Sequence, residues 1–484
     1  MGKKILVWVA CCLTAMLAFA GCAGSYKHGP LSGDFSGDVV SNGGFVVEKG
    51  NYVYFINGVE SSTSDNTFGT PVKGALMRVS KTDLSNPEIV VPRLMVAGDY
   101  TAGFWIYDDY VYYATPTTAK NKAGQVENSY LDFARTKLDG TGTSKSPLFR
   151  LETNTTPYRV MKTGDDVCIV YYDSVNKALK SYNVATQKTS AIAENVSAYL
   201  FPVEKDSDLI YYSTTVKNED TNANELYNVV YSVKGNGSEN KIVLSGIGKT
   251  DYNKMTAEEK EGISEPVELQ GINFTILKNA GGKVYYSTSV VNASTELVRY
   301  YVAGSFTEDV VANVKNATVV TETAGVMTSA AMITEYGILY VDSSRGIVLN
   351  TYDATNGDSR RFIAGEKAKA ATLQFVSGDK LYYSLTTTNG FNMYVVSLTE
   401  NTDTIPESHK ITENVFASSW YAPELIGDRL FYASTTDRTY KYVYVIDMTK
   451  YTEEDYAAAM IGKMNEADTK TEEEAKAKDE EAAA

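Results

Sequence analysis

The stretch Asp108–Ala114, DDYVYYA, decides the fold, because its acidic turn, aliphatic residue and aromatic pair return along the whole chain. Such copies recur at roughly 40–50 residues, lengthened by insertions, which is typical of a repeat architecture. The eight copies are Val53-Tyr54-Phe55, Val111-Tyr112-Tyr113-Ala114, Val170-Tyr171-Tyr172-Asp173, Ile210-Tyr211-Tyr212-Ser213, Val284-Tyr285-Tyr286-Ser287, Leu339-Tyr340-Val341-Asp342, Leu381-Tyr382-Tyr383-Ser384 and Leu430-Phe431-Tyr432-Ala433.

Each copy extends into a four-stranded unit. In the first copy, the apolar stretch Phe45-Val46-Val47 precedes the turn, and Leu76–Val79 follows the aromatic pair as a third strand. A second turn at Asp83–Asn86 leads to a fourth strand at Glu88–Val91. The turn residues are those that tolerate positive φ or bond their own backbone. The pattern predicts an antiparallel meander.

Consecutive apolar residues in the second strand require both faces of each sheet to be covered. Stacking like sheets radially achieves this and leaves only short outer edges exposed. The sequence therefore predicts an all-β fold, a β-propeller over residues 38–450 with eight four-stranded antiparallel blades. Seven blades are the alternative if the copy around Leu339-Tyr340-Val341 lies in an irregular segment.

Three segments depart from the repeat. The insertion Ser245–Pro266 is expected to form one or two helical turns at Met255–Lys260. No fourth strand follows the last copy, so Asp38-Val39-Val40 is expected to complete that blade and close the ring. Residues 451–484 hold eleven acidic and four basic side chains. This tail is predicted to be helical or disordered, with a short helix at Ala457–Met464.

Residues 1–21 are predicted to be an export signal. Lys3-Lys4 precede an apolar run from Ile5 to Ala20, and small residues stand directly before Cys22. Two other interpretations remain open: Ala18-Phe19-Ala20 also fits a cleavage site that would release a soluble protein, and the apolar run could stay as an uncleaved anchor. All three place the bulk of the chain outside the cytoplasm.

Ala20-Gly21-Cys22 resembles the lipobox of bacterial lipoproteins, with Phe19 where that family prefers Leu. The resemblance implies cleavage before Cys22, a diacylglyceryl group on its thiol and often an acylated N-terminus, such as a palmitate. Two or three acyl chains attach a protein stably to a membrane. The resemblance thus implies the lipid bilayer as a partner, a location on the extracytoplasmic face of the cell membrane, and residues 22–37 as a linker.

The repeats also resemble those of extracytoplasmic lipoproteins of Gram-positive bacteria. In those proteins a turn, Val/Leu/Ile-Tyr-Tyr, a polar stretch, an apolar strand and an Asp-x-x-Gly-like turn recur in propellers of unknown function, similar to low-density-lipoprotein-receptor-type propellers. The resemblance spans residues 38–450. It implies an architecture and hardly any chemistry, because fold and function separate readily on such scaffolds.

Composition excludes several classes of function. The net charge is −15 and no basic cluster occurs, which argues against nucleic acid as a partner. Cys11 and Cys12 lie in the signal and Cys22 would carry lipid, so Cys168 alone remains and a disulfide framework is excluded. Cys168 is expected in the core.

The chain offers little for catalysis or metal binding. Its two histidines, His28 and His409, lie in a predicted linker and a predicted loop, so no catalytic residue, zinc site or cofactor is predicted. Trp105 and Trp420 each adjoin a predicted strand, so core packing is favoured over ligand recognition.

Acidic clusters are the remaining candidates. The pairs Asp108-Asp109 and Asp165-Asp166 and the triplet Asp206-Ser207-Asp208 carry the hard oxygen ligands that Ca²⁺ takes, but each stands where a hairpin turn is expected. Asp353–Asp358 looks like a calcium loop and lacks its closing Glu. The structural role is favoured for all of them, and no metal ligand is predicted.

The expected function follows from the scaffold. A lipid-anchored, non-enzymatic propeller would bind a protein or a cell-wall glycan through its loops. One alternative is an extracytoplasmic enzyme that acts on polysaccharide through paired loop carboxylates. Another is a structural partner in envelope assembly.

Overall fold

The computed structural model describes residues 31–36, 40–41, 44–57, 75–91, 104–116, 122–124, 130–142, 148–152, 158–204, 207–217, 226–246, 249–261, 274–292, 295–304, 306–308, 313–314, 317–324, 331–351, 360–399, 404–416, 422–435, 443–450 and 459–461. Strands dominate these residues. The α-helices among them are α2 (Lys249–Lys254) and α3 (Ala257–Lys260). No helix in the described ranges is long and apolar enough to cross a membrane.

The strands follow one another as short hairpin-connected segments. In chain order they are β1 Val40–Ser41, β2 Val46–Lys49, β3 Tyr52–Asn57, β4 Ala75–Ser80, β5 Glu88–Val91, β6 Trp105–Tyr107, β7 Tyr110–Pro116, β8 Tyr130–Lys137, β9 Phe149–Glu152, β10 Tyr158–Thr163, β11 Asp166–Asp173, β12 Ala178–Asn183, β13 Lys188–Ala193, β14 Val196–Leu200, β15 Leu209–Lys217, β16 Leu226–Lys234, β17 Lys241–Ser245, β18 Thr275–Ala280, β19 Lys283–Asn292, β20 Thr295–Ala303, β21 Thr318–Ala324, β22 Met332–Ile333, β23 Gly337–Asp342, β24 Gly346–Thr351, β25 Arg360–Ala364, β26 Ala371–Ser377, β27 Lys380–Thr387, β28 Gly390–Ser397, β29 His409–Phe416, β30 Glu424–Ile426, β31 Arg429–Ser434, β32 Val443–Asp447 and β33 Ala459–Met460.

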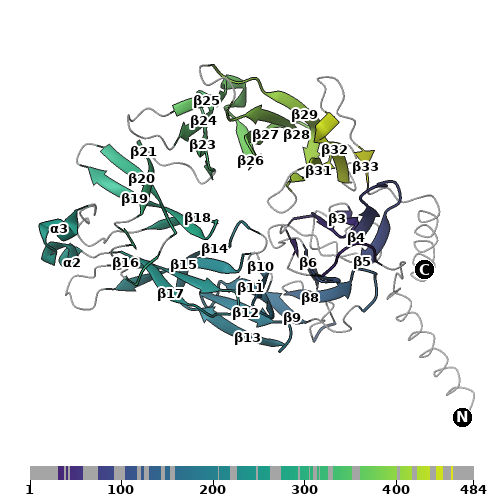
Figure 1. The fold of residues 1–484 in the computed structure, drawn as a ribbon, viewed down its shortest axis with the longest axis horizontal. Helices are drawn as coiled ribbons and strands as arrows, with labels where there is room; N and C mark the ends of the chain where they lie inside the picture. The colour runs from purple at the N-terminus through teal and green to yellow at the C-terminus, as the bar shows by residue number, and fades with distance from the viewer. Residues whose placement is uncertain are drawn as a thin grey trace, which may run out of the picture.

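The predicted meander is the repeating unit of the structure. Five four-stranded antiparallel sheets have the orders β2-β3-β4-β5, β10-β11-β12-β13, β14-β15-β16-β17, β18-β19-β20-β21 and β22-β23-β24-β25. A five-stranded sheet has the order β1-β6-β7-β8-β9, and the strands β26 to β33 form one larger sheet. The sheets follow one another around a propeller-like arrangement, with β14, β18 and β26 toward its middle and β13 and β17 toward its rim (Figure 1). The all-β, propeller-like prediction is confirmed at this level.

The aromatic pairs bury both faces of their sheets. Tyr112 and Tyr113 are neighbours in β7, yet Tyr112 packs into the core shared with β10 and β11, and Tyr113 packs into the core shared with β2 to β5. Tyr382 and Tyr383 in β27 divide in the same way between two cores. Because successive side chains of a strand point to opposite faces, two buried neighbours require a sheet on each side. The physical argument for radial stacking therefore holds.

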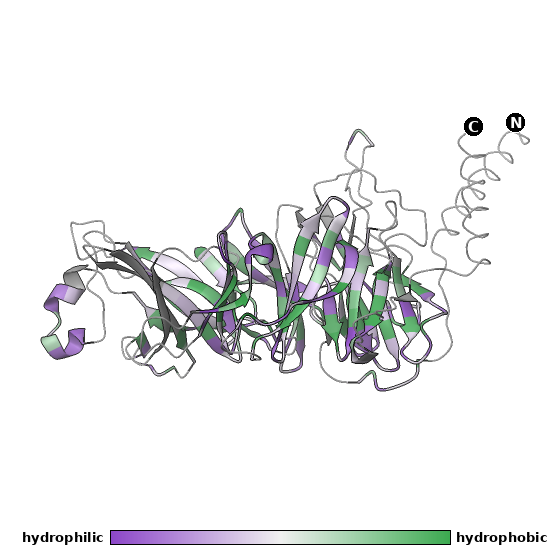
Figure 2. Ribbon diagram, turned by 90° about the horizontal axis from the view of Figure 1, so that it is seen from above, coloured by the Kyte–Doolittle hydropathy of each residue, from purple (hydrophilic) through white to green (hydrophobic). Residues whose placement is uncertain are grey.

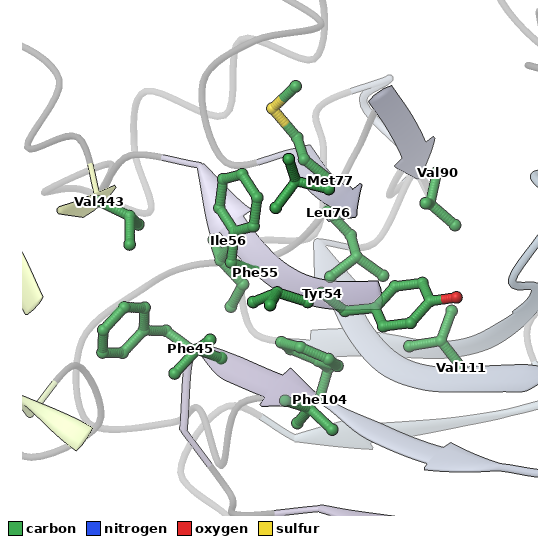
Figure 3. Close-up of a cluster of buried hydrophobic side chains, with 14 of the residues drawn as sticks. Phe45, Tyr54, Phe55, Ile56, Leu76, Met77, Val90, Phe104, Val111 and Val443 are labelled. Carbon is green, nitrogen blue, oxygen red and sulfur yellow. The ribbon is translucent and has the colours of Figure 1, made fainter. Parts of the chain in front are cut away.

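One core joins the first and last sheets. Phe45 at the start of the first sheet is fully buried with Phe431 and Val443 of the last one. Figure 3 shows Val443 facing Phe45 and Phe55 across this core. Burying a side chain of this size stabilises the fold by about 1.5–3 kcal/mol. The strands contain hydrophobic residues from one end of the flat molecule to the other (Figure 2).

The prediction for the last sheet is wrong in two respects. Val40–Ser41 pairs with β6 and not with the last sheet, while Asp38 and Val39 lie outside the described residues. The outer strand of the last sheet is β33, Ala459–Met460, in a segment predicted to be helical. The backbone N–H of Ile461 donates to the carbonyl of Val443 at 3.0 Å, and Ile461 is 1% exposed. Burial of Ile461 in the end-to-end core favours a strand here over a solvated helix.

Two further segments have defined positions. The insertion before β18 contains helical turns as predicted, and the Thr256 hydroxyl accepts from the Glu259 backbone N–H in a capping box at the start of α3. Residues 31–36, at the end of the predicted linker, pack against the first sheet. There Gly50 has φ +57°, and a Cβ at this position would lie 2.5 Å from the ring of Phe35.

Candidate functional site

The inner edge of β6 holds a short extended segment. Val40–Ser41 (β1) pairs with it antiparallel, with Val40 opposite Ile106 and Ser41 opposite Trp105. The equivalent first strands of the neighbouring sheets, among them β10, β14 and β18, are end strands in the part of the chain that the structure describes. An end strand presents backbone N–H and C=O groups along one side. The edges of β10, β14 and β18 toward the middle of the molecule are thus equivalent to the edge of β6 that pairs with β1.

Two cations of β10 lie over two aromatic rings of β6. The Arg159 guanidinium carbon is 5.2 Å from the ring centroid of Trp105, and the Lys162 Nζ is 5.6 Å from that of Tyr107. Trp105 and Tyr107 alternate along β6 and therefore stand on the same side of it. Cations over aromatic faces gain electrostatic attraction within about 6 Å. These four residues form the β6/β10 cluster.

Arg159 is the unusual member of this cluster. Burial lowers the pKa of its guanidinium to about 10, and no carboxylate counteracts the shift. Among the described residues, the Trp105 ring is the one partner of the Arg159 guanidinium. Other arginines differ: Arg150 donates to Asp132 at 2.7 Å and Arg429 to the carbonyl of Lys81 at 2.9 Å.

The indole of Trp105 is also incompletely bonded. Trp105 is 1% exposed, in agreement with the core role predicted for it, and its Nε1 has no hydrogen-bond acceptor among the described atoms. Buried indole N–H groups usually find an acceptor. The β6/β10 cluster therefore combines positive charge with an indole N–H that has no acceptor among the described atoms.

Of the acidic residues predicted in turns, Asp108, Asp109 and Asp165 lie in turns, whereas Asp166 begins β11. Asp108, with φ +48°, and Asp109 connect β6 to β7, and Asp109 pairs with Lys137 at 3.4 Å. Asp166 accepts from Asn183 at 2.7 Å. Asp206 and the whole of Asp353–Asp358 are outside the described residues. No group of three His, Cys, Asp or Glu suited to a metal occurs in the ranges described.

A second set of carboxylates caps turns elsewhere in the chain. In each, the carboxylate accepts from the backbone N–H and the hydroxyl of the residue two positions later: Asp34 with Ser36, Asp83 with Ser85, Asp139 with Thr141, Asp342 with Ser344 and Asp447 with Thr449. The donors of Ser85 lower the pKa of Asp83. These carboxylates form side-chain turns, which explains their place in the repeat.

The remaining sequence-predicted residues divide between the core and the part of the chain not described. Cys168 is buried in β11 as predicted, and burial raises the pKa of its thiol. His409 begins β29 where a loop was expected. His28, Trp420 and the predicted lipid-attachment residue Cys22 lie outside the described residues.

Comparisons with known proteins give structural similarities only. No protein-family model matches the sequence, and no curated protein matches it. A puromycin-hydrolyzing peptidase of Mycobacterium tuberculosis is 10% identical with a TM-score of 0.38, over 75% of this chain and 53% of that one. The acylaminoacyl peptidase of Pyrococcus horikoshii is 11% identical with a TM-score of 0.34, over 75% and 52%. The tricorn protease is 10% identical with a TM-score of 0.35, over 90% and 36%. This chain thus spans about half the length, or less, of these structures.

The predicted function is corrected by this comparison. The sequence suggested a non-enzymatic binding scaffold, with a polysaccharide-active enzyme or an envelope-assembly partner as alternatives. The similar structures are instead an acylaminoacyl peptidase, a puromycin-hydrolyzing peptidase and the tricorn protease, so the comparison gives no support to the predicted scaffold function. The sequence repeat specifies strands and turns and leaves the chemistry open.

Proposed function

We propose that this chain is a peptidase-type propeller, the part of a peptide-hydrolysing assembly that takes up an extended peptide at the inner edges of its sheets. The observation that carries this proposal is β1, which is held on the inner edge of β6 by antiparallel pairing. An extended peptide that adds to a strand edge gains affinity from main-chain hydrogen bonds and specificity from alternate side chains. The edges of β10, β14 and β18 would receive substrate in the same manner.

The finer architecture belongs to the same proposal. With β1 set apart, the described strands β2 to β33 divide into eight groups of four, and we infer eight blades. The groups are β2–β5, β6–β9, β10–β13, β14–β17, β18–β21, β22–β25, β26–β29 and β30–β33. Contacts between the first and last groups support a closed ring: the Phe45 backbone N–H donates to Glu424 at 3.2 Å, and Arg429 donates to the Lys81 carbonyl at 2.9 Å. A ring of this kind places all inner edges around one axis.

Hydrolysis is assigned to a peptidase that works with the propeller. A histidine-dependent nucleophile needs its base within hydrogen-bond reach. The chain has two histidines: His409 lies in β29, which pairs with β28 and β31, and His28 lies outside the described residues. The proposed role of this chain is therefore selection and delivery of the peptide.

Binding of an extended peptide provides the test. A fluorescent eight-residue peptide of alternating Val and Thr should bind the full chain, measured by anisotropy. The same peptide with alternate backbone nitrogens methylated should bind at least about tenfold more weakly, because each methyl group removes a main-chain donor. Equal affinity for both peptides would refute edge pairing.

A matched pair of variants localises the binding. Val40→Pro removes a backbone N–H from β1 and weakens its pairing with β6. Freeing this edge should increase peptide binding, whereas Val40→Ala should leave it unchanged. Unchanged binding in Val40→Pro would show that the β6 edge is not a peptide site.

We also propose attachment to the outer face of the cell membrane through acylated Cys22. Two or three acyl chains hold a protein on a bilayer, whereas loss of the modified cysteine removes them. Cys22→Ser should therefore abolish labelling by a palmitate analogue and move the protein from the membrane to the soluble fraction. Continued membrane association without label would favour the uncleaved anchor.

A further inference from the structure

Arg159 is a partly buried cation for which the described residues supply no anion. The guanidinium lies over the Trp105 ring at 5.2 Å, and burial lowers its pKa to about 10 without opposing influence from a carboxylate. A buried charge without a partner is costly, so such groups normally pair or bind a ligand. A cation kept in this state is better explained by a ligand than by a contribution to the fold.

The surroundings of Arg159 define the ligand chemistry. The Trp105 Nε1 is a second donor with no acceptor within the described part of the chain, and Lys162, three residues along β10, adds positive charge over Tyr107. A guanidinium presents donors in a fork that matches the two oxygens of a carboxylate. Donors and positive charge together select an anion with acceptor oxygens.

The position of Arg159 connects this chemistry to the peptide. Arg159 lies in β10, whose inner side is an end-strand edge among the described strands. Its guanidinium reaches Trp105, the residue opposite Ser41 in the β1–β6 pairing. A peptide held between these edges would therefore bring a carboxylate to Arg159.

We propose that Arg159, supported by Trp105 and Lys162, binds the C-terminal carboxylate of the peptide. This inference rests on the proposed function and names the feature by which the propeller would recognise its substrate. A free C-terminus would distinguish short peptides from the interior of a folded protein chain. An aspartate or glutamate side chain offers the same chemistry, and the test separates these two sources.

Three peptides and two variants test the inference on the full chain. The peptides share one neutral alternating sequence and end in a free carboxylate, in an amide, or in an amide with an internal aspartate. The free carboxylate should bind at least about tenfold more tightly than the plain amide, and Arg159→Gln should abolish this difference. Arg345→Gln is the matched control, because Arg345 also lies over an aromatic ring, Phe362 at 5.9 Å, but in an exposed turn. It should keep the difference.

The outcomes separate the inference from the proposed function. A carboxylate preference that survives in Arg159→Gln overturns the inference and leaves peptide binding intact. Preference for the internal aspartate over the free terminus overturns the C-terminal assignment. If no peptide binds, the proposed function fails, and propionate decides the anion site: it should raise the melting temperature of the wild type and not that of Arg159→Gln. Absence of that shift overturns the site.

Stability without ligand gives an independent readout. If Arg159 served the fold, its replacement by Met would lower the midpoint of urea unfolding. A residue held unpaired for a ligand should be replaceable without loss, because Met fills similar space without the charge. A lower midpoint for Arg159→Met would overturn the inference.

Discussion

Arg78 shows what a buried arginine does when it is structural. It is 2% exposed, donates to Glu88 at 2.8 Å and to the Leu138 carbonyl at 3.3 Å, and lies over the Tyr52 ring. Arg78→Ala should lower the free energy of unfolding by about 3 kcal/mol, because packing and two hydrogen bonds are lost. Urea unfolding of this variant checks the value, with Arg345→Ala, which should change it by less than about 0.5 kcal/mol, as control. Equal effects of the two substitutions would contradict this role.

Asp173 predicts a dependence of stability on pH. Burial raises the pKa of its carboxyl, but Lys180 at 2.5 Å and Asn176 at 2.7 Å outweigh burial and lower the pKa from 3.8 to about 2. A lowered pKa in the folded state gives stability that is present above pH 4 and lost as the pH falls through about 2. Asp173→Asn should therefore cost about 1 kcal/mol at pH 7, after allowance for solvent screening. In urea titrations this difference should vanish toward pH 2, and a constant difference would contradict the assignment.

Strands with a strong pattern were predictable, and short ones were not. The aromatic pairs predict the second strand of a four-stranded unit, because two adjacent buried side chains in a strand need a covered face on each side of the sheet. The strand β33 has two residues and carries no periodicity, so Ala459–Met460 was assigned to a helix. The β6/β10 cluster could not be predicted from the sequence either, since the contact between Arg159 and Trp105 depends on how two sheets pack. Only the core position of Trp105 followed from the sequence.

The strand β33 should be required for the stability of the last sheet. Ile461 follows it and is buried in the core that joins the first and last sheets. Ile461→Ala should lower the free energy of unfolding by about 2–4 kcal/mol, the usual cost of emptying a buried aliphatic site. Val175→Ala removes methyl groups from a residue that is 69% exposed and should change it by less than about 0.5 kcal/mol. A neutral Ile461→Ala would show that the tail does not belong to the sheet.

At the scale of the molecule, the contact between the first and last sheets decides whether each sheet has two neighbours. Phe45, Phe431 and Val443 share one core, and Glu48 lies 3.9 Å from Arg429 beside it. A linear stack would leave its two end sheets free to unfold first, as in solenoid repeats. The proposed closed ring would have no such ends, and it would hold β1 and the inner edges at fixed positions around one axis.

Opening this contact should therefore change where the protein unfolds locally. Phe431→Asp places a charge in the shared core, which is unfavourable without a partner. Hydrogen exchange should then rise in β2, β3, β31 and β32, while β11 and β15, whose residues do not belong to this core, stay protected. Leu179→Asp, in the core between β10–β13 and β14–β17, is the matched control and should reverse this pattern. If Phe431→Asp left exchange in β2 and β31 unchanged, the two ends would not be joined and the inner edges would not form one continuous peptide path.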